Sequence, residues 1–488
     1  MRSIFEQVIA HAGSIHTLEK ILELLSWDQE TMLPPGGHKY RSGQQSLLAG
    51  IIQEKKLDPI YFQNLEKLLP QPSDQSDEAI IIRRLYSDIA KARKIPVAFV
   101  EKLSTTTSEA FAAWQEARRQ NSWKIFEPHL AAIVPLMRKK AELLGYEGHP
   151  LDPLLDQHDP GMTAQQTAAL FSSLKSKLKP LLEEVKRTEW YGEANEKDST
   201  TDEEQMAVCR TTASLIGFDW NRGRLDTSEH PFSVGLHPTD ARMTIRRHSN
   251  DLFDQITSAL HEAGHSFYEM GLDQDRIGTP LAQAASFSIH ESQSRFWETV
   301  IGRSHAFVSA LFPLIKKSPV SSEKELYRAL NHVKCSEIRV HADEVTYPFH
   351  IILRFEIEQE LLDGRLQVHD LPERWNSGMK EMLGVSPRDD FHGCLQDVHW
   401  SFGYFGYFPS YTLGSWYAVC FFEALKRDLP NVEELIRSGT FAPIKSWLQK
   451  NVWSQGRRFF SQELVAKALG RAPSEDDYMQ YLRNKYCK

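Results

Sequence analysis

The sequence has few cysteines, and no two of them stand at metal-binding spacing. The five cysteines, an odd number, include no Cys-x-x-Cys pair. Such usage is typical of a reducing compartment and argues against both a disulfide framework and a cysteine-rich zinc site. We therefore expect a cytoplasmic protein. Any metal site in it should use imidazole and carboxylate ligands, since the chain contains 19 histidines.

Long apolar runs and an excess of positive charge are also missing. No stretch approaches the ~20 apolar residues of a membrane-spanning helix, and the first 27 residues carry charged side chains where a signal peptide has its apolar core. With 57 Lys and Arg against 65 Asp and Glu, the net charge is −8. We expect neither a membrane nor a nucleic acid as a partner.

The chain lacks a long flexible linker. Its 488 residues would suggest roughly three domains at ~150 residues each. The only polar breaks, at 70–76 and 193–204, are not Gly/Ser spacers, and no internal repeat is visible. We therefore predict a single domain over residues 1–488, with two lobes around one cleft.

Strand-like alternation is scarce, and helical periodicity dominates the sequence. Apolar residues recur at three- and four-residue spacing over 15–25, 78–93, 107–119, 126–145, 164–188, 203–216, 250–270, 322–340, 349–363, 415–427 and 432–468. A last helix should begin at Pro473-Ser-Glu475. The best strand is 240–247, which could pair with residues near 231–236. The pattern predicts a mainly α fold, a large bundle-like helical body with one small β-sheet.

The sequence His261-Glu262-Ala-Gly-His265 is an H-E-x-x-H motif. On a helix, residues four apart share a face, so the two imidazoles can bind one Zn²⁺. Glu262 is offset by about 100° around the helix and can accept a proton from a water beside the metal. The motif predicts a metal site with Glu262 as its general base.

The surroundings of the motif favour a helix. Ser249 and Asn250 can cap its start, and Gly271 can end it. The metzincin pattern would need glycine at 268 and histidine at 271, where this chain has Tyr268 and Gly271. That class of metallopeptidase is therefore excluded.

The third metal ligand is not determined by spacing. No carboxylate occurs between residues 277 and 290, so Glu291 is the first candidate on a following helix, for which Ser288 is a plausible cap. His290 competes with it, and Glu298 lies two turns later on the same face. An ion pair with Arg295 would explain either glutamate without any metal.

Three other polar groups have both a structural and a functional interpretation. Arg339 and Asp343 are four apart, which allows an intrahelical ion pair or an arginine that clamps a carboxylate. The segment 393–414 mixes glycines with aromatic residues, which favours an irregular packed segment but also offers neutral donors to an oxyanion. His230 and Arg242 lie just before the metal helix, where a turn and a strand would explain them.

Taken together, these motifs resemble a known family. The chain contains HPF at 230–232, DxRxT at 240–244, HExxH at 261–265, HESQ at 290–293, IRxxAD at 338–343 and GxxQDxHW at 393–400. In this order they resemble the thermostable metallocarboxypeptidases of the carboxypeptidase Taq type, over nearly the whole chain. The resemblance implies a helical zincin fold similar to neurolysin, with a deep active-site cleft, and usually a homodimer.

The same resemblance implies an activity and a metal. It implies removal of single residues from peptide C-termini with broad specificity, and one divalent ion, most often zinc, with cobalt possible. It makes His261, His265 and Glu291 the ligands and Glu262 the general base.

The resemblance also implies residues that contact the substrate. Arg339 would anchor the C-terminal carboxylate of the peptide. His399 and Tyr411 would face the tetrahedral intermediate, with Tyr407 as second choice. Two more residues would lie near the substrate: His230 and Arg242.

Two alternatives stay open at this point. One is a zinc oligopeptidase or dipeptidyl-type peptidase of the same helical class, which would cut internal bonds or release dipeptides. The other is a non-catalytic helical scaffold that keeps a metal for stability. Glu262 argues against the scaffold, because structural zinc sites prefer four protein ligands and need no base.

Overall fold

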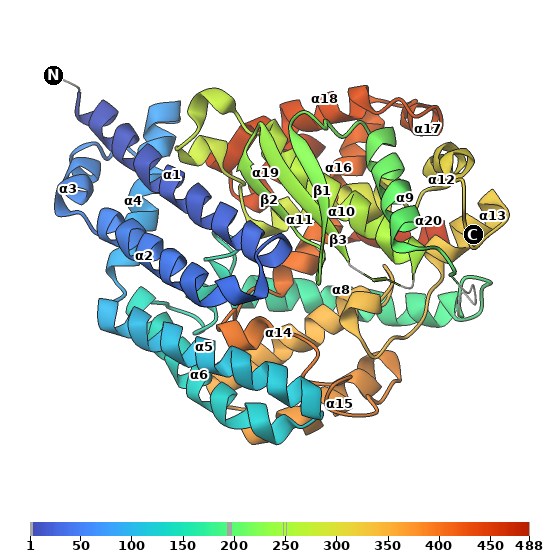
Figure 1. The fold of residues 1–488 in the computed structure, drawn as a ribbon, viewed down its shortest axis with the longest axis horizontal. Helices are drawn as coiled ribbons and strands as arrows, with labels where there is room; N and C mark the ends of the chain where they lie inside the picture. Colours follow the sequence, from blue (N-terminus) through green and yellow to red (C-terminus); the bar gives the residue numbers. More distant parts are fainter. Residues whose placement is uncertain (1–2, 193–197, 247, 250, 488) are drawn as a thin grey trace. The chain divides into compact units, whose positions relative to one another are not determined.

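The computed structural model describes residues 3–192, 198–246, 248–249 and 251–487. They form a mainly helical protein with a single three-stranded sheet (Figure 1). The predicted fold class is thereby confirmed. Within these residues, no helix combines the length and the apolar character that crossing a membrane would require.

The chain divides into two compact units, and each is built from separate stretches of sequence. The first unit consists of residues 1–93, 195–330 and 421–472. Its sheet has the strands β1 (Gly223–Ser228), β2 (Ser233–His237) and β3 (Asp240–Arg246). Its helices are α1 (Ile4–Thr31), α2 (His38–Lys56), α3 (Pro59–Lys67), α4 (Asp77–Arg93), α9 (Asp202–Leu215), α10 (Leu252–Gly271), α11 (Phe287–Arg295), α12 (His305–Leu311), α13 (Glu323–Asn331), α17 (Val432–Arg437), α18 (Ala442–Asn451) and α19 (Ser461–Leu469).

The second unit consists of residues 94–194, 331–420 and 473–488. Its helices are α5 (Val97–Gln120), α6 (Trp123–Leu144), α7 (Asp152–Leu155), α8 (Ala164–Val185), α14 (Tyr347–Asp363), α15 (Leu371–Leu383) and α20 (Glu475–Tyr486). The helix α16 (Pro409–Asp428) begins in the second unit and ends in the first.

The sheet supports the helix that carries the H-E-x-x-H motif. Its strand order is β1-β3-β2, with β1 parallel and β2 antiparallel to the central β3. The apolar side chains of β3 are buried, and α10 packs against β3 and β2. The predicted pairing of 240–247 with 231–236 is confirmed for the described residues, whereas β1 was not expected.

Both ends of α10 differ in detail from the prediction. The side chain of Asp251 accepts hydrogen bonds from the backbone N–H groups of Phe253 and Asp254, so Asp251 is the N-cap in place of Ser249. Asn250 lies outside the described residues. Gly271 is the last helical residue, and a Cβ there would meet the side chain of Trp453 at 2.6 Å. Its small size is therefore needed for packing against Trp453.

The predicted helix over 322–340 is wrong in its second half. The helix α13 ends at Asn331, and the backbone of Val333 pairs instead with the chain at Trp190 and Gly192. A short 3-10 turn over Arg339–His341 follows. Arg339 and Asp343 are therefore not on one helix, and Asp343 accepts hydrogen bonds from the backbone of Val345 and Thr346 at the start of α14.

The last helix of the second unit, α20, is anchored at both ends. The helix α20 begins at Glu475, where the sequence predicted it, and its N-cap Ser474 makes a capping box. The buried carboxylate of Glu344 accepts hydrogen bonds from Lys485 at 2.7 Å, Tyr486 at 2.7 Å and Tyr481 at 3.0 Å. Tyr486 is fully buried, so the end of α20 is anchored inside the unit.

Candidate metal centre

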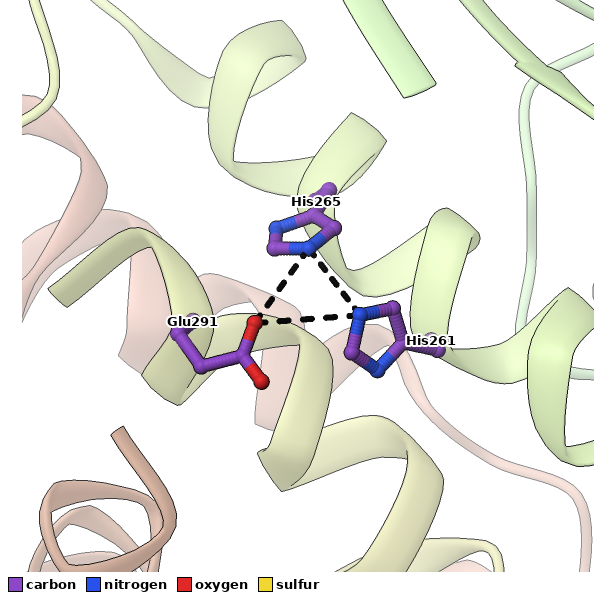
Figure 2. A group of neighbouring side chains, drawn as sticks. All are labelled: His261, His265 and Glu291. Atoms are coloured by element: carbon purple, nitrogen blue, oxygen red, sulfur yellow. Dashed lines mark hydrogen bonds and ion pairs between the residues drawn. The ribbon is translucent and has the colours of Figure 1, made fainter. Parts of the chain in front are cut away.

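Two helices of the first unit bring three predicted ligands together. His261 and His265 project from α10, and Glu291 projects from α11 toward them (Figure 2). The two imidazole Nε2 atoms are 3.2 Å apart. The Oε2 atom of Glu291 lies 3.7 Å from Nε2 of His261 and 3.6 Å from Nε2 of His265. Among the described residues, this is the one group of three or more His, Cys, Asp or Glu that could hold a metal ion.

The spacing of these atoms fits a small tetrahedral ion. Zinc ligands at 2.0–2.2 Å from the ion and at tetrahedral angles are about 3.3–3.5 Å apart. The measured separations of 3.2–3.7 Å bracket that value. Two imidazoles and one carboxylate, with one position left open, are also the donor set of a catalytic zinc site.

A glycine inside the motif allows the two helices to approach. A Cβ at Gly264 would stand 2.5 Å from the backbone oxygen of Gln293 and 2.7 Å from the Cα of Ser294, both on α11. Only a residue without a side chain permits this contact. The contact lies two and three residues from Glu291, so Gly264 sets how closely its carboxylate approaches the imidazoles.

The Nδ1 atom of His261, the ring nitrogen that faces away from Glu291 (the rear nitrogen), is held by a buried carboxylate. This Nδ1 atom lies 2.9 Å from Glu298, which also accepts hydrogen bonds from Arg295 at 2.8 Å and Arg303 at 3.1 Å. Burial alone would raise the pKa of Glu298, but Arg295 and the bond from His261 hold this pKa far below its usual range. Glu298 is therefore ionised and fixes the orientation of the imidazole.

The rear nitrogen of His265 contacts another histidine. His265 Nδ1 lies 2.6 Å from Nδ1 of His290, and Nε2 of His290 lies 2.8 Å from Oε1 of Glu269. His290 and Glu298 were the two alternatives to Glu291 as the third ligand. Each of them instead contacts the Nδ1 atom of a ligand histidine, whereas the Nε2 atoms of these histidines face Glu291.

The predicted general base is buried beside this group. Glu262 has only 6% of its surface exposed, and it does not belong to the group of three potential ligands. Burial raises the pKa of Glu262 to about 7, against the opposing effects of His261 and a hydrogen bond from Ser233 of β2. A carboxylate with that pKa can both accept and return a proton near neutral pH.

The two predicted substrate contacts of the first unit lie before α10. Arg242 on β3 donates two hydrogen bonds of 2.8 Å to Asp240, and its guanidinium lies 4.5 Å from the ring centre of Trp27. His230 is exposed, and its backbone oxygen accepts a hydrogen bond from Ser228. Asp240 and Trp27 thus account for the position of Arg242, and its role with substrate stays a prediction.

A second cluster of predicted residues lies inside the second unit, around Asp397. One carboxylate oxygen of Asp397 accepts a hydrogen bond of 2.9 Å from Nε of Arg339, and the other accepts one of 2.7 Å from Nε of Arg354. Gln396 accepts hydrogen bonds from the backbone of Arg339 and the side chain of Arg354. Arg339 therefore pairs with Asp397, and an ion pair with Asp343 is ruled out.

The predicted oxyanion donors adjoin this cluster. Nε2 of His399 lies 3.1 Å from the hydroxyl of Tyr411, and the guanidinium of Arg339 lies 4.9 Å from the Tyr411 ring. The ring of Tyr407 is 5.4 Å from both rings. Burial lowers the pKa of His399 to about 3, so its imidazole is neutral. The structure thus brings Arg339, His399, Tyr407 and Tyr411 together.

The sequence-based prediction missed Arg354. Its side chain is fully buried, and it shares Asp397 with Arg339. A lone arginine amid the apolar residues of 349–357 was a usable signal, because an unpaired buried charge is costly and implies a partner. Gly264 gave no such signal, since its role depends on the packing of α11.

Comparison with known proteins agrees with the motifs and the geometry. The family model for carboxypeptidase Taq (M32) metallopeptidases matches residues 7–486. The chain belongs to this family. Among curated relatives, thermostable carboxypeptidase 1 of Thermus thermophilus is 38% identical in an alignment of 486 positions that covers 95% of this chain and 94% of that protein.

Solved structures of the M32 family share the fold. The apo-Mg structure of Pyrococcus furiosus carboxypeptidase gives a TM-score of 0.95 at 35% identity and covers 100% of this chain and 99% of that chain. The M32 carboxypeptidase of Deinococcus radiodurans R1 gives 0.94 at 36% identity, with 99% of each chain covered. The protein is therefore a metal-dependent carboxypeptidase, and the oligopeptidase and scaffold alternatives are not supported.

Proposed function

We propose that this M32 enzyme removes single amino acids from peptide C-termini with broad specificity, using one divalent ion held by His261, His265 and Glu291. The observation that carries the proposal is the convergence of these three donors, 3.2–3.7 Å apart, beside the buried carboxylate of Glu262. Two imidazoles and a carboxylate favour Zn²⁺, and Co²⁺ accepts the same donors.

The proposed chemistry begins with a proton transfer to Glu262. A bound divalent ion at this site supplies Lewis-acid chemistry, which acidifies water and polarises the scissile carbonyl. Glu262 accepts the proton of the attacking water and then delivers it to the leaving amine. In the metal-free site, burial raises its pKa to about 7, which favours proton uptake by this carboxylate. Glu298 holds the imidazole of His261 in place during these steps.

The residues of the second unit are proposed to bind the peptide. The group of Arg339, Asp397 and Arg354 carries two positive charges and one negative charge. Its net positive charge suits binding of the negatively charged C-terminal carboxylate of a substrate. His399 and Tyr411 are neutral hydrogen-bonding groups for the oxyanion, with Tyr407 as second choice. His230 and Arg242 are proposed to lie near the peptide.

The wider organisation is also a proposal. We propose one peptidase domain that includes both units, a homodimer, and a cytoplasmic location. The motifs of the family run through both units, and the cysteine usage suits a reducing compartment. Light scattering of the purified protein tests the dimer, which fails if the mass is that of one 488-residue chain.

Mass spectrometry of peptide products tests the proposed reaction. A peptide with a free C-terminus should lose residues one at a time, whereas its C-terminally amidated counterpart and any chelator-treated sample should stay intact. Internal cleavage of the amidated peptide would refute the exopeptidase reaction.

A substitution tests the proposed base. Glu262→Gln should bind the ion at full stoichiometry yet lose at least ~10²-fold in kcat, because the amide cannot accept the proton. Glu203→Gln, at an exposed position of α9, is the matched control and should behave as wild type. A Glu262→Gln enzyme with wild-type kcat would refute the role of Glu262.

A further inference from the structure

His290 stands in the HESQ motif beside the proposed ligand Glu291, yet the proposed reaction gives it no chemical step. Its Nδ1 lies 2.6 Å from the rear nitrogen of His265, and its Nε2 lies 2.8 Å from Glu269. We propose that His290 and Glu269 form a positioning relay that orients His265 and strengthens its bond to the ion. This inference rests on the proposed function of His265 as a ligand.

The hydrogen-bond direction along the relay follows from the ligand. If His265 binds an ion through Nε2, its one proton is on Nδ1, which must donate to Nδ1 of His290. His290 then carries its own proton on Nε2 and donates it to Glu269. A carboxylate at the end of the chain thus fixes both tautomers and increases the electron donation of the ligand nitrogen.

Three elements of the first unit build the relay. Glu269 lies four residues after His265, so both project from one face of α10, while His290 comes from α11. On β2, a Cβ at Gly235 would stand 2.5 Å from Oε2 of Glu269 and 2.6 Å from its Cβ. The glycine therefore leaves the room in which the Glu269 side chain reaches His290.

The outer end of the relay faces a small cavity. This cavity of about 200 Å³ is lined by Glu269, by Gly235 and by residues of α1 that include Lys20 and Glu19. Lys20 donates a hydrogen bond of 2.7 Å to the backbone oxygen of Gly235, and Glu19 pairs with Lys56. Glu19 shares the cavity with Glu269 without any hydrogen bond to His290, so it offers a matched control.

The affinity for Zn²⁺, measured by competition with a chromophoric chelator on the full chain, tests the relay. His290→Leu removes both hydrogen bonds and should weaken the affinity by about 10–100-fold. His290→Asn and Glu269→Gln each keep one hydrogen-bonding group and should lose less than His290→Leu. Gly235→Ala should weaken binding through displacement of Glu269, while Glu19→Gln should match wild type.

Two further readouts separate positioning from a general loss of structure. The visible spectrum of the Co²⁺-loaded protein should change in His290→Leu, because the ligand field depends on the orientation of His265. The melting temperature of each metal-free variant reports its fold. If His290→Leu does not fold, the conservative pair His290→Asn and Glu269→Gln decides, and affinities within twofold of wild type in both would overturn the relay.

The failure of the relay differs from the failure of the proposed metal site. If His265→Ala loses Zn²⁺ while a folded His290→Leu binds it as tightly as wild type, the relay is refuted and the ligand set stands. If His265→Ala binds Zn²⁺ as tightly as wild type, the ligand set is refuted and the relay with it.

Discussion

The close contact of α10 and α11 at Gly264 should control metal affinity. In Gly264→Ala the new Cβ would stand 2.5 Å from the backbone oxygen of Gln293, whereas ordinary contact begins at 3.4 Å. The two helices must therefore separate by about 0.9 Å, and the backbone of α11 cannot rotate away as a side chain could. Glu291 lies on the segment that has to move.

The size of the effect follows from two opposing terms. Overpacking of this kind costs about 1–3 kcal/mol, and alanine gains about 1 kcal/mol over glycine within a helix. The free energy of unfolding should therefore fall by about 0–2 kcal/mol, which a protein of this size can tolerate. The displaced Glu291 carboxylate should cost the Zn²⁺ affinity about tenfold or more, equivalent to about 1.4 kcal/mol.

Chelator competition and thermal unfolding of the same samples measure both quantities. Gly50 on α2 offers a control, because a Cβ there would meet nothing within 4 Å. Gly50→Ala should leave the Zn²⁺ affinity unchanged and stabilise the fold by up to about 1 kcal/mol. If Gly264→Ala binds Zn²⁺ within twofold of wild type, the glycine does not set the position of Glu291.

Three further perturbations address the remaining site residues. Arg339→Ala should reduce kcat/KM for peptides with a free carboxylate by about 10–100-fold, from the loss of a charged hydrogen bond, and an unchanged KM would contradict the anchor. Tyr411→Phe should reduce kcat by about 10²-fold. The control Tyr404→Phe, at a half-exposed side chain, should keep the kcat of wild type. A Tyr411→Phe enzyme with the kcat of wild type would exclude Tyr411 as an oxyanion donor. Burial lowers the pKa of His261, but Glu291 and the bond to Glu298 outweigh it and raise this pKa from 6.5 to about 9. The proton on His261 therefore stabilises the metal-free fold fully below pH 6.5, and this stabilisation is lost as the pH rises toward 9. Because Zn²⁺ must displace that proton, the Zn²⁺ affinity should rise over the same pH range by up to about tenfold per pH unit. A flat affinity profile in chelator titrations would contradict this.

Local spacing was sufficient to predict the metal helix but not the third ligand. His261 and His265 are four residues apart, so any helix places them together. Glu291, His290 and Glu298 all lie on the next helical stretch, and which of them faces the two Nε2 atoms depends on how α11 packs against α10, including the close contact at Gly264. That contact joins residues about 30 positions apart, and spacing alone contains no information about it. Only the resemblance to the family singled out Glu291.

Long-range pairing also explains the errors in secondary structure. The apolar periodicity of 322–340 is genuine, but the backbone of Val333 hydrogen-bonds to Trp190 and Gly192, which ends the helix. The helix α2 escaped prediction because it buries only Ile52 and so has no apolar stripe. The strand β1 escaped because its parallel partner β3 lies beyond β2 in the sequence. For the end of α13 and for β1, the deciding partner lies outside the segment that the local pattern covers.

The anchored end of α20 bears on how the second unit unfolds. Here Tyr486 is fully buried and Lys485 is ion-paired to the buried Glu344. Unfolding the last turn of α20 would leave the buried carboxylate of Glu344 without these partners, at a cost of several kcal/mol. We therefore expect the last helix to unfold only together with the rest of the second unit.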